Sequence, residues 1–162
     1  MNEQSLASQI LETWEQHHHT MLFLLEHLPA EALGKTLSTK GGRTIAKQLA
    51  HLHQVRIAHL EAFAKKQGWE MMRFEKEEEP TKEQLAMALE QSGEAITKFF
   101  EFSLHEKEGK ALGFKNGVIS MLGFLISHEA HHRGHLLLTA KQSGIKLPEE
   151  LKWKLWEWEK MW

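Results

Sequence analysis

Apolar residues recur along most of this chain at intervals of three and four positions, with polar residues between them. In residues 4–28 and 43–67 this spacing places the apolar side chains on one side of a helix with about 3.6 residues per turn. The same spacing continues over residues 81–104 and 117–142, and a shorter apolar stripe follows Pro148. Alternating runs that would predict strands are scarce. The pattern therefore predicts an all-α fold, a four-helix bundle with a short C-terminal helix.

Turn and capping residues separate the predicted helices. The Gly41-Gly42 pair marks the loop after the first helix. Gly68 stands just beyond the second helix, where glycine commonly ends a helix in a left-handed conformation. Thr81, with Gln84 three residues later, matches a capping box at the start of the third helix. The acidic run that precedes Thr81 is expected to be a solvated linker.

Length and composition narrow the functional classes. At 162 residues the chain has the size of one domain, so we expect a single domain over residues 1–162. The formal net charge of -2 offers no basic excess for nucleic acid. Because cysteine is absent, the chain has no disulfide framework and no thiolate ligand. The N-terminus lacks a signal-peptide pattern, and no apolar run is long enough to span a bilayer. We therefore expect a cytoplasmic protein with no nucleic-acid or membrane partner.

Four histidines stand within about two helical turns in the fourth predicted helix, in the stretch ISHEAHHRGH over residues 126–135. Residues four apart lie on one face of a helix, so His128 and His132 can reach one divalent ion together. His131 and His135 have the same spacing, but His131 lies to one side of the apolar row and His135 at its edge. We therefore favour His128 and His132 as metal ligands. They continue a row formed by Val118, Met121, Leu125, Leu136 and Thr139.

The alternative is that these histidines are ordinary hydrogen-bonded residues of a half-buried helix. Two features favour a metal site: the chain has no cysteine to act as a ligand instead, and the second predicted helix carries further histidines. Periodicity alone does not choose among His51, His53 and His59. His51 shares its face with small or neutral side chains that leave room beside an ion, whereas His59 lies among larger apolar residues.

Two stretches carry a resemblance to a known family. Residues 42–56, GRTIAKQLAHLHQVR, followed by HEAHHRG at residues 128–134, resemble the DinB-like family of four-helix-bundle metalloproteins, which includes the YfiT-like hydrolase and thiol-transferase group. The resemblance extends over nearly the whole chain. It implies that one histidine of the second helix and the HxxxH pair of the fourth bind a divalent metal ion. Family members often have glutamine where this chain has His135, which could offer a fourth nitrogen. The implied ligands are His51, His128 and His132.

The resemblance also implies a reaction. Three histidines leave a coordination position for water or substrate, which is typical of catalytic zinc. The family likeness then implies an enzyme that activates water or a low-molecular-weight thiol, and therefore a small-molecule substrate. Neutral imidazoles bind zinc, nickel or iron, so the ligands do not name the metal. The alternative is a non-catalytic stress-response homodimer in which the same histidines hold a structural ion or none. The broad apolar surface of residues 117–142 suits such subunit packing.

The helical pattern also predicts where other polar residues lie, although it gives them no role in the metal site. His18 falls on the apolar side of the first helix, where we expect a core-edge or surface histidine; the alternative is a position beside the metal ligands or facing a substrate. Arg56 is expected to pair with an acidic neighbour, and the alternative is that it fixes a carboxylate. Glu129 points about 100° away from His128, so we expect it at the surface or beside the ligands rather than as a general base. The roles of His53, His131 and His135 stay open. The terminal stripe, expected to pack on the bundle or a second subunit, contains Leu151, Leu155, Trp158 and Trp162.

Overall fold

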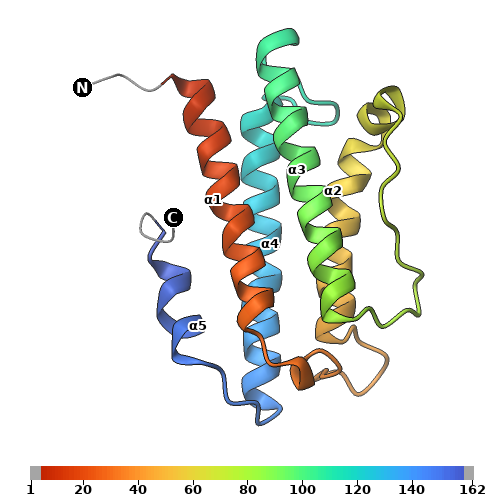
Figure 1. Ribbon diagram of the computed structural model, residues 1–162, viewed down its shortest axis with the longest axis vertical. Helices are drawn as coiled ribbons and strands as arrows, with labels where there is room; N and C mark the ends of the chain where they lie inside the picture. The colour runs from red at the N-terminus through yellow and green to blue at the C-terminus, as the bar shows by residue number, and fades with distance from the viewer. Residues whose placement is uncertain (1–4, 159–162) are drawn as a thin grey trace.

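The computed structural model describes residues 5–158, and these fold as a bundle of four long helices with a short fifth helix beside it (Figure 1). No β-strand occurs in this part of the chain. No helix within it is long and apolar enough to cross a membrane. The predicted all-α fold is confirmed. In chain order the elements are α1 (Leu6–His27), the 3₁₀ helix η1 (Ala30–Ala32), α2 (Ile45–Gln67), α3 (Lys82–Glu106), α4 (Gly117–Gln142), α5 (Glu149–Trp153) and the 3₁₀ helix η2 (Lys154–Trp156).

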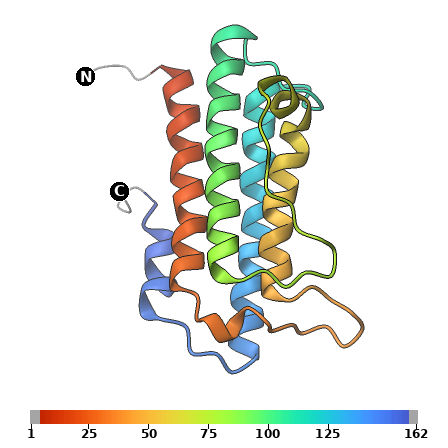
Figure 2. The ribbon, with the colours of Figure 1, turned by 45° about the vertical axis from the view of Figure 1, so that its right-hand side comes forward.

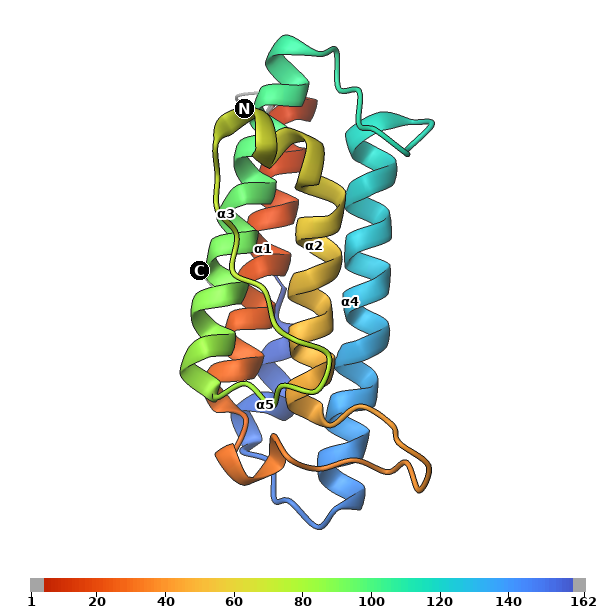
Figure 3. The same ribbon diagram turned by 90° about the vertical axis from the view of Figure 1, so that its right-hand side faces the viewer.

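The long helices do not simply alternate in direction. α1 and α4 run one way and α2 and α3 the other, as the colours from the N- to the C-terminus show (Figure 2). The connection between α2 and α3, residues 68–81, therefore runs along the length of the bundle (Figure 3). α2 packs against α3 and also against α4. Because α2 and α4 are neighbours, side chains far apart in the sequence meet between them.

The helix ends follow the local sequence signals. The side chain of Thr44 accepts a hydrogen bond from the backbone N–H of Lys47, so α2 begins at Ile45 rather than at residue 43. Gly68 ends α2 in the left-handed conformation, with φ of 69°. The capping box predicted at Thr81 is present, with hydrogen bonds in both directions to its partner three residues later. Residue Gly117 begins α4 at φ 64°, where a Cβ atom would lie 2.0 Å from the carbonyl oxygen of residue 109.

The C-terminal segment departs from the single helix that its spacing predicts. α5 is only five residues long and passes into the 3₁₀ helix η2, which has a different spacing of side chains. Two tryptophans of this segment stay outside the core, with Trp153 67% and Trp156 80% exposed. Trp162 lies outside the described residues. The two exposed tryptophans flank the predicted stripe, whose described members do pack on the bundle: Leu151 and Leu155 are buried, and the ring of Trp158 lies 6.3 Å from that of His17.

Candidate metal centre

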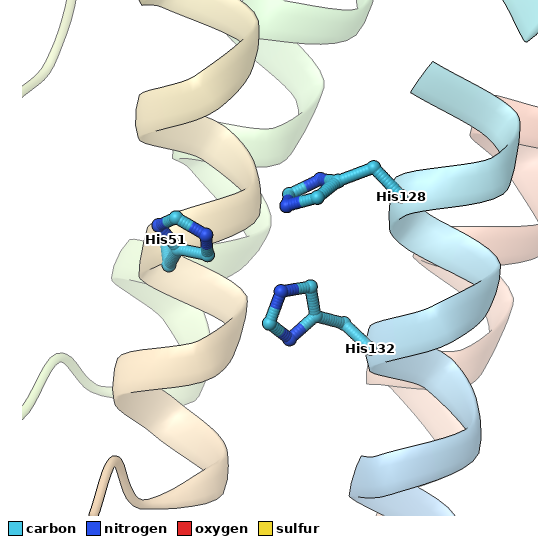
Figure 4. A group of neighbouring side chains, drawn as sticks. All are labelled: His51, His128 and His132. Carbon is cyan, nitrogen blue, oxygen red and sulfur yellow. The ribbon is translucent and has the colours of Figure 1, made fainter. Parts of the chain in front are cut away.

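Three histidines from two helices converge between α2 and α4. Figure 4 shows His51 extending from α2 toward His128 and His132, which extend from α4 one turn apart. The ring centroids lie 5.2 Å apart for His51 and His128, 5.1 Å for His51 and His132, and 4.8 Å for His128 and His132. One nitrogen of each ring lies within 4.8 Å of the other two. The three histidines are thus placed to bind one metal ion.

The geometry and chemistry of these donors fit a divalent transition-metal ion. Nitrogen ligands at about 2.0–2.1 Å in a tetrahedral arrangement are about 3.4 Å from one another. The rings therefore need to move inward by only about 1 Å to reach that arrangement. In addition, the Nδ1 atom of His128 is buried and has no hydrogen-bond partner among the described residues. Such an unpaired buried nitrogen is costly, and coordination to an ion is one way to satisfy it.

The three imidazoles are held in the neutral form that binds metals. Burial lowers the pKa of His51 to about 4, with a further contribution from the positive charge of Arg43. Burial likewise lowers the pKa of His132 to about 4, and the neighbouring imidazoles act in the same direction. The pKa of His128 is lowered as well, again chiefly by burial. At neutral pH an ion therefore does not have to displace protons from these rings.

A side chain on α2 orients one of the candidate ligands. The Nδ1 atom of His132 lies 3.3 Å from Oε1 of Gln48, which can accept its N–H. This hydrogen bond favours the tautomer in which Nε2 carries the free lone pair. His51 and Gln48 stand on the same face of α2, as their spacing predicts. The role of Gln48 depends on the approach of α4, and the sequence gives no direct signal for it.

A buried ion pair lies behind the three histidines. The carboxylate of Glu129 accepts hydrogen bonds from Nε and Nη2 of Arg56, both at 2.7 Å, and from Nε2 of His17 at 2.9 Å. Glu129 and Arg56 are both fully buried, at 0% exposure. Arg56 therefore pairs with an acidic residue as expected. Of the two positions expected for Glu129, the surface is wrong, and the carboxylate instead lies in the interior beside the ligands. The network joins α1, α2 and α4 beside the candidate ligands.

The position of Glu129 corrects the interpretation of α4. The buried stripe of this helix passes through Glu129, whereas His128 and His132 lie beside the stripe and are only half-buried. The other five members of the row chosen from the sequence are all buried, so that row is confirmed, and the structure adds Glu129 to the buried face. Periodicity missed this because a charged residue breaks an apolar stripe, even where another helix supplies its counter-ion. The signal available was a pair of opposite charges, Arg56 and Glu129, each on the inner side of its helix.

His18 belongs to the same interior and is buried rather than at the core edge, with 6% exposure. Its Nδ1 atom accepts a hydrogen bond of 3.2 Å from Nη1 of Arg56. Its ring stacks on Trp14, with centroids 6.1 Å apart and planes 6° from parallel. Burial, with the positive charge of Arg56 in second place, lowers the pKa of His18 to about 3.

This low pKa predicts a loss of stability in acid. In the unfolded chain His18 takes up a proton below about pH 6.5, while the folded protein keeps it neutral down to about pH 3. Its titration therefore does not change the free energy of unfolding above about pH 6.5. Below that pH it lowers this free energy more and more as the pH falls toward 3. Going from pH 7 to pH 5 should lower the free energy of unfolding of both the unchanged protein and the His18→Gln variant, each free of metal. We expect the decrease to be about 2 kcal/mol larger for the unchanged protein. Urea unfolding at both pH values measures this difference, and equal losses would contradict the prediction.

The remaining histidines of the two helices have other surroundings. His131 and His135 form an exposed pair with ring centroids 4.2 Å apart. The ring of His135 lies 6.3 Å from that of His132, and the structure does not bring it into the group of three. Nε2 of His53 is buried and donates to the carbonyl oxygen of Met72 at 2.7 Å. His59 instead contacts the aromatic rings of Phe114 and Phe124.

A hollow of about 500 Å³ lies beside the three histidines. It is bounded by the loop before α2 and by the exposed side of α4, and His132 forms part of its wall. The pair His131 and His135 lines the same hollow. A small molecule in this hollow would therefore touch a candidate ligand of the metal centre directly.

Comparison with known proteins agrees with this description. A model of the DinB family matches residues 1–157, which is nearly the whole chain. No curated protein and no solved structure matches the chain significantly. The match covers all four long helices and all three converging histidines.

Proposed function

The chain belongs to the DinB family, and from that premise we propose that it is a metal-dependent enzyme that activates water or a low-molecular-weight thiol. The observation that carries the proposal is the convergence of three neutral imidazoles beside a hollow large enough for a small-molecule substrate. The reaction class is that of a hydrolase or a thiol transferase. The ion is zinc, nickel or iron, since each accepts neutral imidazole ligands.

In this proposal each residue of the centre has a definite role. His51, His128 and His132 hold the ion, and Gln48 keeps the ring of His132 in its ligating tautomer. A divalent ion bound there lowers the pKa of water or of a thiol toward neutrality and polarises a bound carbonyl or ester. Glu129 faces the interior and is already committed to three hydrogen bonds, so it does not act as the base.

The test begins with elemental analysis of purified, untagged protein and its histidine variants. We expect about one divalent ion per chain in the unchanged protein. His51→Ala, His128→Ala and His132→Ala should each lose it while keeping the helical circular dichroism, because all three histidines lie outside the apolar core. The matched control is His135→Ala, which removes an imidazole one turn from His132 and should leave the metal content unchanged.

Two outcomes would count against the proposal. Full metal retention in His132→Ala would overturn the ligand assignment. Absence of metal from the unchanged protein, even after reconstitution with zinc, nickel and iron salts, would overturn the proposal of a metal-dependent enzyme. If the ion is present, the loaded protein is assayed for thiol transfer to electrophiles and for hydrolysis of esters and amides, with His51→Ala as the inactive control.

A second candidate function is a non-catalytic stress-response homodimer with a structural ion or none. The observation that favours it is a set of apolar side chains left exposed on α4: Ile119 is 54% exposed, Phe124 40% and Leu138 49%. Such residues are typical of surfaces that pack on a second subunit. An ion bound at full occupancy with no turnover of either substrate class would favour this candidate. Under both candidate functions we propose a cytoplasmic protein without nucleic-acid or membrane partners.

A further inference from the structure

One positively charged side chain beside the metal centre has no counter-ion among the described residues. Arg43 is exposed and immediately precedes Thr44, the residue that caps the start of α2. The ion pairs within residues 5–158 do not include it. Lys47, one turn further along, differs in this respect because its ammonium lies 3.3 Å from Glu77 and 3.5 Å from Glu79. The guanidinium of Arg43 is therefore available to a ligand.

Arg43 lines two hollows, each of which touches one histidine of the centre. It lines the hollow of about 500 Å³ together with His132. It also lines a second hollow, of about 320 Å³, together with His51. A guanidinium in this position would repel a metal ion through space, and this repulsion is relieved when an anion binds between the two. The placement is thus suited to a negatively charged ligand that touches both groups.

The wall of the larger hollow around Arg43 is rich in hydrogen-bond donors. Over residues 5–158, no aspartate or glutamate lines it. The hydroxyl oxygen of Thr36 accepts a hydrogen bond from the backbone N–H of Ser38, and that of Ser38 accepts one from the backbone N–H of Lys40. Each hydroxyl therefore keeps its own proton to donate. An anion in this hollow would meet a guanidinium and two hydroxyl groups without facing a carboxylate.

The opposite side of the centre is apolar. The ring of Phe124 stacks on that of His128, with centroids 5.7 Å apart and planes 11° from parallel. Phe114 packs against Phe124 at 5.7 Å. The centre thus lies between a donor-rich side at Arg43 and an aromatic side at Phe124. A substrate with one anionic end and one apolar end would be bound in a single orientation.

We propose that Arg43 binds a carboxylate or phosphate group of the small molecule that reacts at the three-histidine centre. This inference rests on the proposed function and adds to it the substrate class, an anionic small molecule. The planar guanidinium matches the geometry of both groups, because it can donate two parallel hydrogen bonds to their oxygens. Arg43 is then the residue that selects charged substrates over neutral ones of the same length.

The test compares two thiols of similar length on cobalt-loaded protein, in which coordination of a thiolate gives a charge-transfer absorption band. The probes are 3-mercaptopropionate, which carries a carboxylate, and 2-mercaptoethanol, which carries a hydroxyl. We expect the protein to bind 3-mercaptopropionate about ten times more tightly than 2-mercaptoethanol, because Arg43 pairs with the carboxylate. Arg43→Gln should abolish this preference, and Arg43→Lys should keep part of it. The matched control is Lys40→Gln, which removes an exposed cation of the same loop that does not line the hollow.

The outcomes separate this inference from the proposed function. If both thiols coordinate and Arg43→Gln leaves their affinity ratio unchanged, the inference is overturned while the proposed function stands. If neither thiol coordinates, the thiol reaction fails, and calorimetry with propionate and inorganic phosphate tests the anion site alone. Binding of either anion that is lost in Arg43→Gln supports the inference, and the anion bound tells carboxylate from phosphate recognition. Absence of such binding overturns it.

Discussion

Replacing Glu129 by alanine is expected to lower the free energy of unfolding by about 3–5 kcal/mol. Burial by itself would raise the pKa of Glu129, but the guanidinium of Arg56 and the hydrogen bonds from Arg56 and His17 hold it well below its ordinary range. The carboxylate is therefore charged, and it balances an arginine that is itself fully buried. Without it, Arg56 remains as an uncompensated charge in the bundle interior. Urea unfolding of the metal-free protein at pH 7 measures the loss.

Two comparisons show whether the buried charge is responsible. Glu94→Ala removes the partner of Lys98 from a surface pair in which the side chains are 60% and 58% exposed. It should change the free energy of unfolding by less than about 0.5 kcal/mol. The double variant Arg56→Met with Glu129→Leu removes both charges and should cost less than Glu129→Ala alone. An effect of Glu129→Ala as small as that of Glu94→Ala would refute the prediction.

Gly93→Ala is expected to destabilise the protein by about 3 kcal/mol, although alanine is the better helix former. A Cβ atom at this position in α3 would lie 2.1 Å from two ring atoms of His18. That ring cannot easily retreat, because it stacks on Trp14 and accepts a hydrogen bond from Arg56. The indole N–H of Trp14 in turn donates to the carbonyl oxygen of Gly93 at 3.1 Å. Thermal or urea unfolding of the metal-free variant measures the effect.

Neither the control nor the double variant is expected to show the destabilisation that Gly93→Ala causes by itself. At Gly123 in α4, a Cβ atom would have no described atom of another element within 4 Å, so Gly123→Ala should stabilise by about 0.5–1 kcal/mol. In a His18→Ala background the obstruction is gone, and Gly93→Ala should then be neutral or stabilising. A destabilisation by Gly93→Ala that persists undiminished in that background would show that contact with His18 is not its cause.

Interactions within a few residues account for the features that were predicted well. The bounds of α4, residues 117–142, and the capping box at Thr81 agree with the sequence because caps and helical spacing involve neighbours along the chain. The pairing of His128 with His132 is of the same kind, since their separation by four residues brings the rings together within a single helix. The left-handed end of α2 at Gly68 likewise needs only the local conformation that glycine permits.

Features that depend on the relation between helices were predicted less well. The choice of His51 over the other histidines of α2 rested on family resemblance, because periodicity leaves each of them on a helix surface. The structure brings His51 to the pair on α4 and turns His53 toward the connection between α2 and α3. The buried position of Glu129 and the need for Gly93 also depend on side chains of other helices.

The amino-acid pattern alone thus accounts for the helices, their ends and the HxxxH pair, since each arises from contacts within about one turn of helix. The metal centre and the buried ion pair depend instead on the direction of each helix and on which helices are neighbours. The long connection between α2 and α3 places α2 antiparallel to α4, so that His51 faces the pair on α4 and Arg56 reaches Glu129. These partners are more than seventy residues apart, and only the packing of apolar faces in three dimensions brings them together.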